Sequence, residues 1–192
     1  MKGIGSVLLP WTIIIIFLIV LFTAFNQQQS NDKYIKLDED PSFPDNLHPV
    51  VEEKTNILID QAKEKGIHVV ITDTVRSKEK QDQLYAQGRT SDGNIVTNAR
   101  GGESYHNYGL AVDYALSDDN GNLIWDIYYD GNGNGKSDWL EVAEIAKDLG
   151  FTWGGDWDNF PDYPHLQMEF GLSIRELQNG KRPAPDIDEK SN

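Results

Sequence analysis

Two histidines and an aspartate stand in segments whose composition suits a hydrolytic metal site. His106 and Asp113 lie in the segment Ser104-Tyr-His-Asn-Tyr-Gly-Leu-Ala-Val-Asp, and His165 closes the later segment Asp162-Tyr-Pro-His. The chain has no cysteine, which excludes thiolate ligands. In such a chain, catalytic zinc takes three ligands from histidine and carboxylate and keeps its fourth position for water. The three residues, with Asp162 as a spare carboxylate, therefore predict a zinc site.

The other two histidines are better explained by structure, since a lone histidine is more often structural than a ligand. His68 lies in Ile67–Thr72, a segment with the apolar character of a strand. His48 precedes Pro49 at an expected helix entry. We therefore expect structural roles for both.

Alternation places Asp113 and His165 on matching faces of two expected strands. Asp113 alternates with bulky residues and shares its side with Ala111 and Ala115, and a charge on such a face needs a cation. The alternative is a plain carboxylate at a strand edge. In the second strand, the side opposite Leu166, Met168 and Phe170 carries His165, Gln167 and Glu169. Two strands with this pattern can present Asp113 and His165 to one cleft.

Composition limits the class of protein. The 192 residues, 39% of them hydrophobic, suffice for one domain with an adequate core. The 31 acidic residues outnumber the 17 basic ones and give a net charge of −14, which argues against nucleic acid as a partner. Without cysteine the protein has no disulfides. We expect a monomer.

Residues 1–25 predict an N-terminal membrane anchor. Between Gly5 and Phe25 only Ser6, Thr12 and Thr23 interrupt the apolar run, and about 20 apolar residues span a bilayer. A cleaved signal peptide is the alternative, but Phe22-Thr-Ala makes a poor cleavage site. We therefore expect a single-pass cell-membrane protein with its domain outside the cytoplasm. The alternative is secretion to the cell wall after cleavage.

Three further segments follow the anchor. Residues 26–46 are rich in Gln, Asn, Asp and Pro and predict a polar linker with too little apolar content to fold. Residues 47–170 form the expected catalytic domain. Residues 171–192 predict a frayed tail with one short helix at Ser173–Asn179.

The domain is predicted to be α+β, with a small antiparallel sheet flanked by helices. The expected helices are Pro49–Lys65, Ser77–Gly88 and Trp139–Leu149, each marked by a cap or a glycine stop. The expected strands are Ile67–Thr72, Ala111–Leu116, Leu123–Tyr129 and His165–Phe170.

A second metal signal lies between the last two strands. Its residues match positions 1, 3, 5, 6, 9 and 12 of a calcium loop: Asp130, Asn132, Asn134, Gly135, Asp138 and Glu141. Against calcium, Ser137 stands where such loops carry an apolar residue, and Asp138 with Glu141 also suffices as a capping box for the next helix. Both interpretations stay open.

Several motifs together resemble a known family. In order, they are Val75–Gln81, Gly101–His106, Asp130–Trp139 and Trp153–Trp157. They are similar to the exported zinc peptidases of the VanY and D-alanyl-D-alanine peptidase type, which share a small α+β fold with the hedgehog amino-terminal domain. Within that family the motifs resemble those of the CwlK-type L-alanyl-D-glutamate endopeptidases. The resemblance covers most of residues 47–170.

The resemblance implies roles for five residues. His106, Asp113 and His165 would bind zinc, Asp162 would be the general base, and Arg76 would hold the substrate or its oxyanion. Many relatives have glutamate at the base position, one methylene longer than the aspartate here. For Asp162 the alternative is a turn former. For Arg76 it is an ion pair with an acid such as Asp73.

Further residues of these motifs are expected to bind substrate. They are Gln81, Ser104, Trp153 and Trp157. The two tryptophans flank a Gly-Gly turn and suit the wall of a cleft, although core packing explains either equally well.

The implied activity is zinc-dependent hydrolysis of the peptidoglycan stem peptide between L-alanine and D-glutamate. The metal would acidify a bound water, Asp162 would accept its proton and return it to the leaving amine, and Arg76 would stabilise the oxyanion. One alternative is a D,D-carboxypeptidase. Another is a zinc-stabilised module that binds the wall without turnover, for which Asp162 would be needless.

Overall fold

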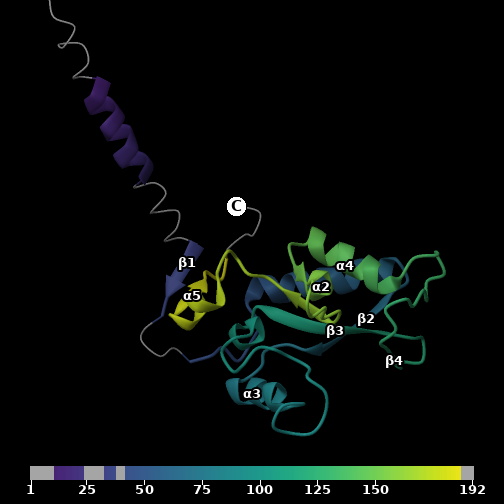
Figure 1. The fold of residues 1–192 in the computed structure, drawn as a ribbon. Coiled ribbons are helices and arrows are strands. Elements are labelled where there is room, and N and C mark those ends of the chain that lie inside the picture. The colour runs from purple at the N-terminus through teal and green to yellow at the C-terminus, as the bar shows by residue number, and fades with distance from the viewer. Residues whose placement is uncertain (1–10, 24–32, 38–41, 187–192) are drawn as a thin grey trace, which may run out of the picture.

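The computed structural model describes residues 11–23, 33–37 and 42–186 (Figure 1). Residues 11–23 are helical. In these ranges no helix is both long enough and apolar enough to cross a membrane. The anchor predicted over residues 1–25 lies partly outside the described residues.

Two helices cover one face of the central sheet. α2 (Pro49–Glu64) starts at a proline, and the Nδ1 atom of its N-cap His48 accepts a hydrogen bond from Val50. It ends before Gly66, whose φ of 78° favours glycine. α4 (Asp138–Asp148) packs beside α2, and Figure 1 shows both above the sheet, with α3 (Lys78–Ala86) below it. The predicted structural role of His48 is confirmed.

The central sheet is antiparallel throughout, as predicted. Its strand order is β2 (His68–Asp73), β3 (Ala111–Ser117), β6 (His165–Gln167) and β5 (Thr152–Trp153), and β4 (Leu123–Ile124) also pairs with β3. The core fills the space between the sheet and the two helices. Its largest side chains include Trp139, Tyr114, Leu58, Leu116 and Leu166, all fully buried. The opposite face of β3 carries Asp113.

Two predicted strands are shorter in the structure. The strand expected over Leu123–Tyr129 ends at Ile124, because Asp126 accepts a hydrogen bond from the backbone of Tyr128 and bends the chain into a turn. The strand expected over His165–Phe170 ends at Gln167. Phe170 has a φ of 50°, which no strand residue adopts.

The linker and tail contain structure that the sequence did not predict. β1 (Tyr34–Lys36) pairs with β7 (Lys181–Pro183) in a two-stranded sheet. Within the tail, α5 (Ile174–Gln178) begins with a capping box, and its Leu177 is fully buried. The expected short helix is therefore confirmed. The frayed tail is a wrong prediction for Lys181–Pro183, because backbone pairing with residues 34–36 offsets their low apolar content.

Candidate metal centre

His106 is held by the short helix η1 (Tyr105–Tyr108), which ends at Gly109. Gly109 has a φ of 68°, and a Cβ there would lie 2.6 Å from the carbonyl oxygen of Asn46, so only glycine fits. The Nδ1 atom of His106 lies 2.6 Å from the carbonyl oxygen of Thr74 and donates to it. This bond leaves the lone pair of Nε2 free to bind a metal.

Asp113 and His165 are direct partners in the register of β3 and β6. The sequence predicted that two strands would present these side chains to one cleft, and the pairing confirms it. Side chains opposite each other on antiparallel strands share a face. The hydrogen bond from the backbone of Tyr114 to the carbonyl of Pro164 extends the pairing by one residue beyond His165.

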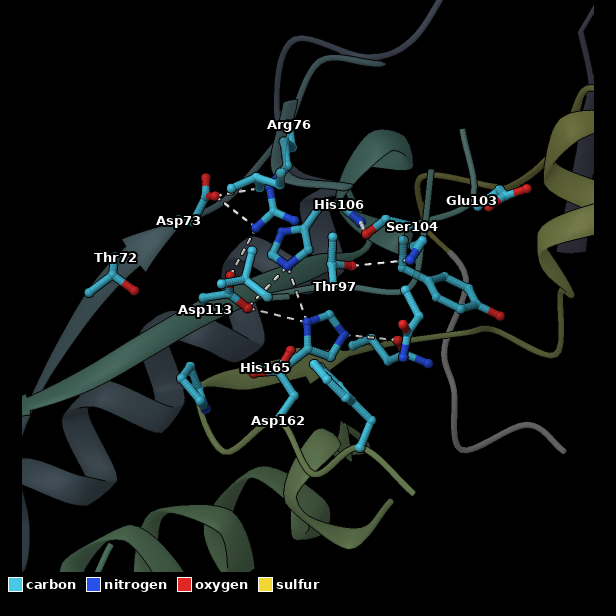
Figure 2. A pocket seen from close by; sticks show the side chains of 18 of the residues that line it. Thr72, Asp73, Arg76, Thr97, Glu103, Ser104, His106, Asp113, Asp162 and His165 are labelled. Carbon is cyan, nitrogen blue, oxygen red and sulfur yellow. Dashed lines mark hydrogen bonds and ion pairs between the residues drawn. The ribbon is translucent and has the colours of Figure 1, made fainter. Parts of the chain in front are cut away.

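The three predicted ligands converge (Figure 2). His106 Nε2 lies 3.1 Å from Asp113 Oδ1 and 3.1 Å from His165 Nδ1, and the last two atoms are 3.2 Å apart. Tetrahedral zinc with bonds of about 2.0–2.1 Å needs its ligand atoms about 3.3 Å apart, so the donor set fits this ion. Within the described ranges, these residues are the single set of three or more His, Cys, Asp or Glu side chains that comes together in this way.

The charges at this centre favour a bound cation. Burial alone would raise the pKa of Asp113, but the neighbouring imidazoles of His106 and His165 lower it strongly, so the carboxylate is ionised. Burial alone would lower the pKa of His165, whereas the hydrogen bond and charge of Asp113 raise it. A negative ligand between two imidazoles thus attracts either protons or a metal ion.

A hydrogen-bonded chain runs from His165 away from the centre. His165 Nε2 donates to the side-chain oxygen of Gln167 at 2.9 Å, and the amide of Gln167 donates to Glu169 at 2.7 Å. This chain keeps the ring proton on Nε2 and leaves Nδ1 for the metal. The sequence showed His165, Gln167 and Glu169 on one face, but we did not predict that they would form this hydrogen-bonded chain. Their spacing of two residues was the signal that could have indicated it.

Arg76 lies beside the ligands in a network of acids. Its guanidinium donates to Asp73 Oδ2 at 2.8 and 3.0 Å, to Asp113 Oδ2 at 3.0 Å and to Gln81 Oε1 at 2.8 Å. The ion pair with Asp73, foreseen as the alternative for Arg76, is confirmed. Arg76 also lines the cleft described below, so a role towards substrate stays a prediction.

Asp162 lies next to His165 (Figure 2) on the loop that joins β5 to β6. Its backbone N–H donates to Gly154, where a Cβ would come within 2.6 Å of the Asp162 carbonyl oxygen. Burial and the charge of Asp113 raise the pKa of Asp162. A carboxylate with a raised pKa at a metal centre suits proton transfer.

A cleft of about 770 Å³ opens over the metal centre. Ser104, Arg76, Asp162 and Trp157 line it, as expected for substrate-binding or catalytic residues. Two expected substrate-binding residues, Gln81 and Trp153, do not line the cleft. Gln81 is fully buried and holds Arg76 and the carbonyl of Ala99. Trp153 is 5% exposed and donates to the carbonyl of Tyr163, so core packing is its role.

The predicted calcium loop is not supported. Its Asp130 accepts hydrogen bonds from the backbone of Asn134 and Gly135, and Glu141 accepts from the side chains of Asn132 and Asn134. Burial raises the pKa of Asp138, which disfavours the ionised form that a calcium ligand needs. Ser137 caps α4 instead of Asp138, because its Oγ accepts from Leu140.

The chain is similar to several known proteins. A family model described as D-alanyl-D-alanine carboxypeptidase matches residues 97–168. The chain is 63% identical over 130 residues to the peptidoglycan L-alanyl-D-glutamate endopeptidase CwlK of Bacillus subtilis (strain 168). This match covers 68% of this chain and 78% of that protein. The chain is also 33% identical over 114 residues to an L-alanyl-D-glutamate peptidase of Listeria phage A118, a match that covers 59% of this chain and 34% of that protein. Among solved structures, the LdcB LD-carboxypeptidase matches with a TM-score of 0.49 and 24% identity, covering 77% of this chain and 82% of that one.

Proposed function

The chain belongs to the metallopeptidase family of the peptidoglycan L-alanyl-D-glutamate endopeptidase CwlK, and from that premise we propose that it cuts the L-alanyl-D-glutamate bond of peptidoglycan stem peptides with the help of zinc. The observation that carries the proposal is the convergence of His106, Asp113 and His165 at 3.1–3.2 Å on the floor of a cleft. The 63% identity to CwlK supports the choice of bond. Because peptidoglycan lies outside the cytoplasm, we propose that the domain works there.

The metal would be held by His106 Nε2, Asp113 Oδ1 and His165 Nδ1. When bound, zinc supplies an acidified water as the nucleophile. Asp162 accepts a proton from the water as its oxygen attacks the carbonyl carbon of L-alanine. As the C–N bond breaks, the Asp162 carboxyl donates that proton to the nitrogen of D-glutamate, which leaves as an amine.

Arg76 and the hydrogen bonds around the ligands hold this arrangement. The guanidinium neutralises part of the charge on Asp113 and Asp73, and it keeps a permanent positive charge at the cleft. We propose that this charge also stabilises the carbonyl oxygen as it becomes negative. Thr74 and Gln167 fix the two imidazole rings from the far side of the metal.

Digestion of purified muropeptides tests the proposal. The zinc-loaded protein is incubated with disaccharide pentapeptides, and the products are identified by mass spectrometry. We expect fragments that begin with D-glutamate, together with a disaccharide that keeps only L-alanine. Release of D-alanine alone would instead show the D,D-carboxypeptidase activity that the family model's description suggests. Intact muropeptides with a bound metal would favour the non-catalytic binding module.

A further inference from the structure

Trp125 is a large exposed side chain on a fixed loop. Its exposed fraction is 57%. The preceding residue, Ile124, pairs with Leu116 of β3, and the hydroxyl of Ser137 donates to the carbonyl of Ile127 two residues later. The loop is thus held on both sides of the indole. Exposure of a tryptophan on a held loop forgoes the free energy of burial, so a ligand that covers it gains that energy.

The Trp125 ring lines the same cleft as the metal ligands. Continuing the register of β3 and β4 by one residue past Ile124 places Trp125 opposite Ala115, two residues along β3 from Asp113. At about 3.4 Å per residue, the backbone of Trp125 lies roughly 7 Å along the strand from the ligand. The buried ring of Trp139, at a centroid distance of 6.4 Å, backs one side of Trp125.

The lining of the cleft combines aromatic and polar side chains. Besides Trp125, its walls carry Trp157 and Phe160, which come from the loop between β5 and β6. The walls formed by α3 and the segment before η1 carry polar groups such as Lys80 and Asn98. A ligand that offers both a face for stacking and charged groups suits this lining.

The proposed substrate has this character. In peptidoglycan, the amino group of L-alanine is joined to the lactyl group of a sugar, and D-glutamate carries a free carboxylate. A single residue spans at most about 3.6 Å, so the lactyl group begins within that distance of the cut bond and the sugar ring follows directly. This reach matches the separation of Trp125 from the metal centre. The uncharged N-acetylated sugars are also not repelled by the net charge of −14.

We propose that Trp125 is a platform on which an N-acetylated sugar of the glycan strand stacks while the adjoining stem peptide is cut. The C–H groups of a sugar ring carry partial positive charge and pack on the negative face of an indole. The inference rests on the proposed function, because it takes the L-alanyl-D-glutamate bond as the point of cleavage. It adds that the enzyme recognises glycan as well as peptide.

Paired substrates test the platform. The zinc-loaded full chain is given the free peptide L-Ala-γ-D-Glu-L-Lys and the same peptide attached to GlcNAc-MurNAc, and kcat/KM is measured for each. We expect the sugar to raise kcat/KM about tenfold in the wild type, as one aromatic contact of about 1.4 kcal/mol would do. Trp125→Ala should reduce the ratio of the two values to about one, and Trp125→Phe should keep part of it.

Tyr128→Ala is the matched control, because Tyr128 is 84% exposed on the same loop and is not part of the cleft wall. It should keep the wild-type ratio. An unchanged ratio in Trp125→Ala, or a ratio near one in the wild type, would overturn the platform. If the wild type cuts neither substrate, the proposed cleavage is wrong. Binding of peptide-free GlcNAc-MurNAc strands, measured by calorimetry on wild type and Trp125→Phe, then still decides the platform: no binding by the wild type refutes it.

Discussion

Two regions of this molecule have the sequence of a metal site, and only one of them is built as such in the structure. The ligands around His106 are far apart in the sequence, yet their donor atoms come within 3.1–3.2 Å of one another. The residues from Asp130 to Glu141 are close together and match a calcium loop almost completely. In the structure their oxygens accept hydrogen bonds from the loop's own N–H groups.

The difference lies in what satisfies each carboxylate. Asp113 is buried beside two imidazoles, which lower its pKa against the effect of burial and keep it ionised, and it also pairs with Arg76. Glu141 is approached by the amides of Asn132 and Asn134 and by Lys65 at 3.7 Å. Carboxylates paired in this way stabilise a turn without any ion. A spacing pattern therefore indicates a metal only where the groups around the carboxylate are themselves metal ligands, as the imidazoles around Asp113 are.

Removal of the metal should have the largest effect. We expect His165→Ala to lose bound zinc and muropeptide hydrolysis together, and chelation of the wild type to abolish hydrolysis until zinc is restored. His68→Ala is the matched control, since His68 is exposed and away from the cleft. Metal content is measured by atomic absorption beside the rate. Full activity in a metal-free preparation would contradict the zinc mechanism.

Asp162→Asn should separate the base from the ligands. The variant should keep zinc, because His106, Asp113 and His165 are unchanged, while kcat falls by roughly 10²- to 10⁴-fold, the usual contribution of a general base. Asp158→Asn, on the same loop, serves as the control. Zinc content and kcat are measured on the same preparations. A variant that keeps both zinc and its rate would remove Asp162 from the mechanism.

The convergence of Asp113 and His165 was predictable because residue type and strand alternation both pointed to it, whereas His106, which lies in η1, was indicated by residue type and not by alternation. The antiparallel α+β fold followed from caps, glycine stops and the order of the elements. The pairing of Tyr34–Lys36 with Lys181–Pro183 was not predictable, since it joins short polar segments from opposite ends of the chain. Nor was the bond from His106 to the carbonyl of Thr74, because a backbone acceptor leaves no mark in the sequence.

The hydrogen-bonded chain from His165 to Gln167 and Glu169 offers a smaller test of the same metal centre. Gln167→Leu removes the acceptor of the His165 Nε2 proton, and we expect the zinc affinity to fall by about 10- to 100-fold. Gln167→Glu keeps an acceptor and should restore most of the affinity. The dissociation constant is measured by competition with a chelating dye. Equal zinc affinities in wild type and Gln167→Leu would show that the hydrogen bond to Gln167 does not position the His165 ring.

The smallest effect is expected in the loop from Asp130 to Glu141. Asp130→Ala removes two hydrogen bonds to backbone N–H groups, and because this carboxylate is exposed we expect a loss of about 1 kcal/mol in the free energy of unfolding. That loss lowers the melting temperature by roughly 3 °C. Asp119→Ala, whose side chain is 98% exposed in the wild type, should change it less.

Calcium decides whether the contrast between the two regions holds. Millimolar calcium should leave the melting temperature of the wild type and of Asp130→Ala unchanged, because protein donors already satisfy the oxygens and the raised pKa of Asp138 weakens it as a ligand. Both melting curves are recorded by calorimetry with and without the ion. A rise in the wild type that Asp130→Ala abolishes would mean that calcium displaces the loop's own hydrogen bonds, and that both regions bind metal.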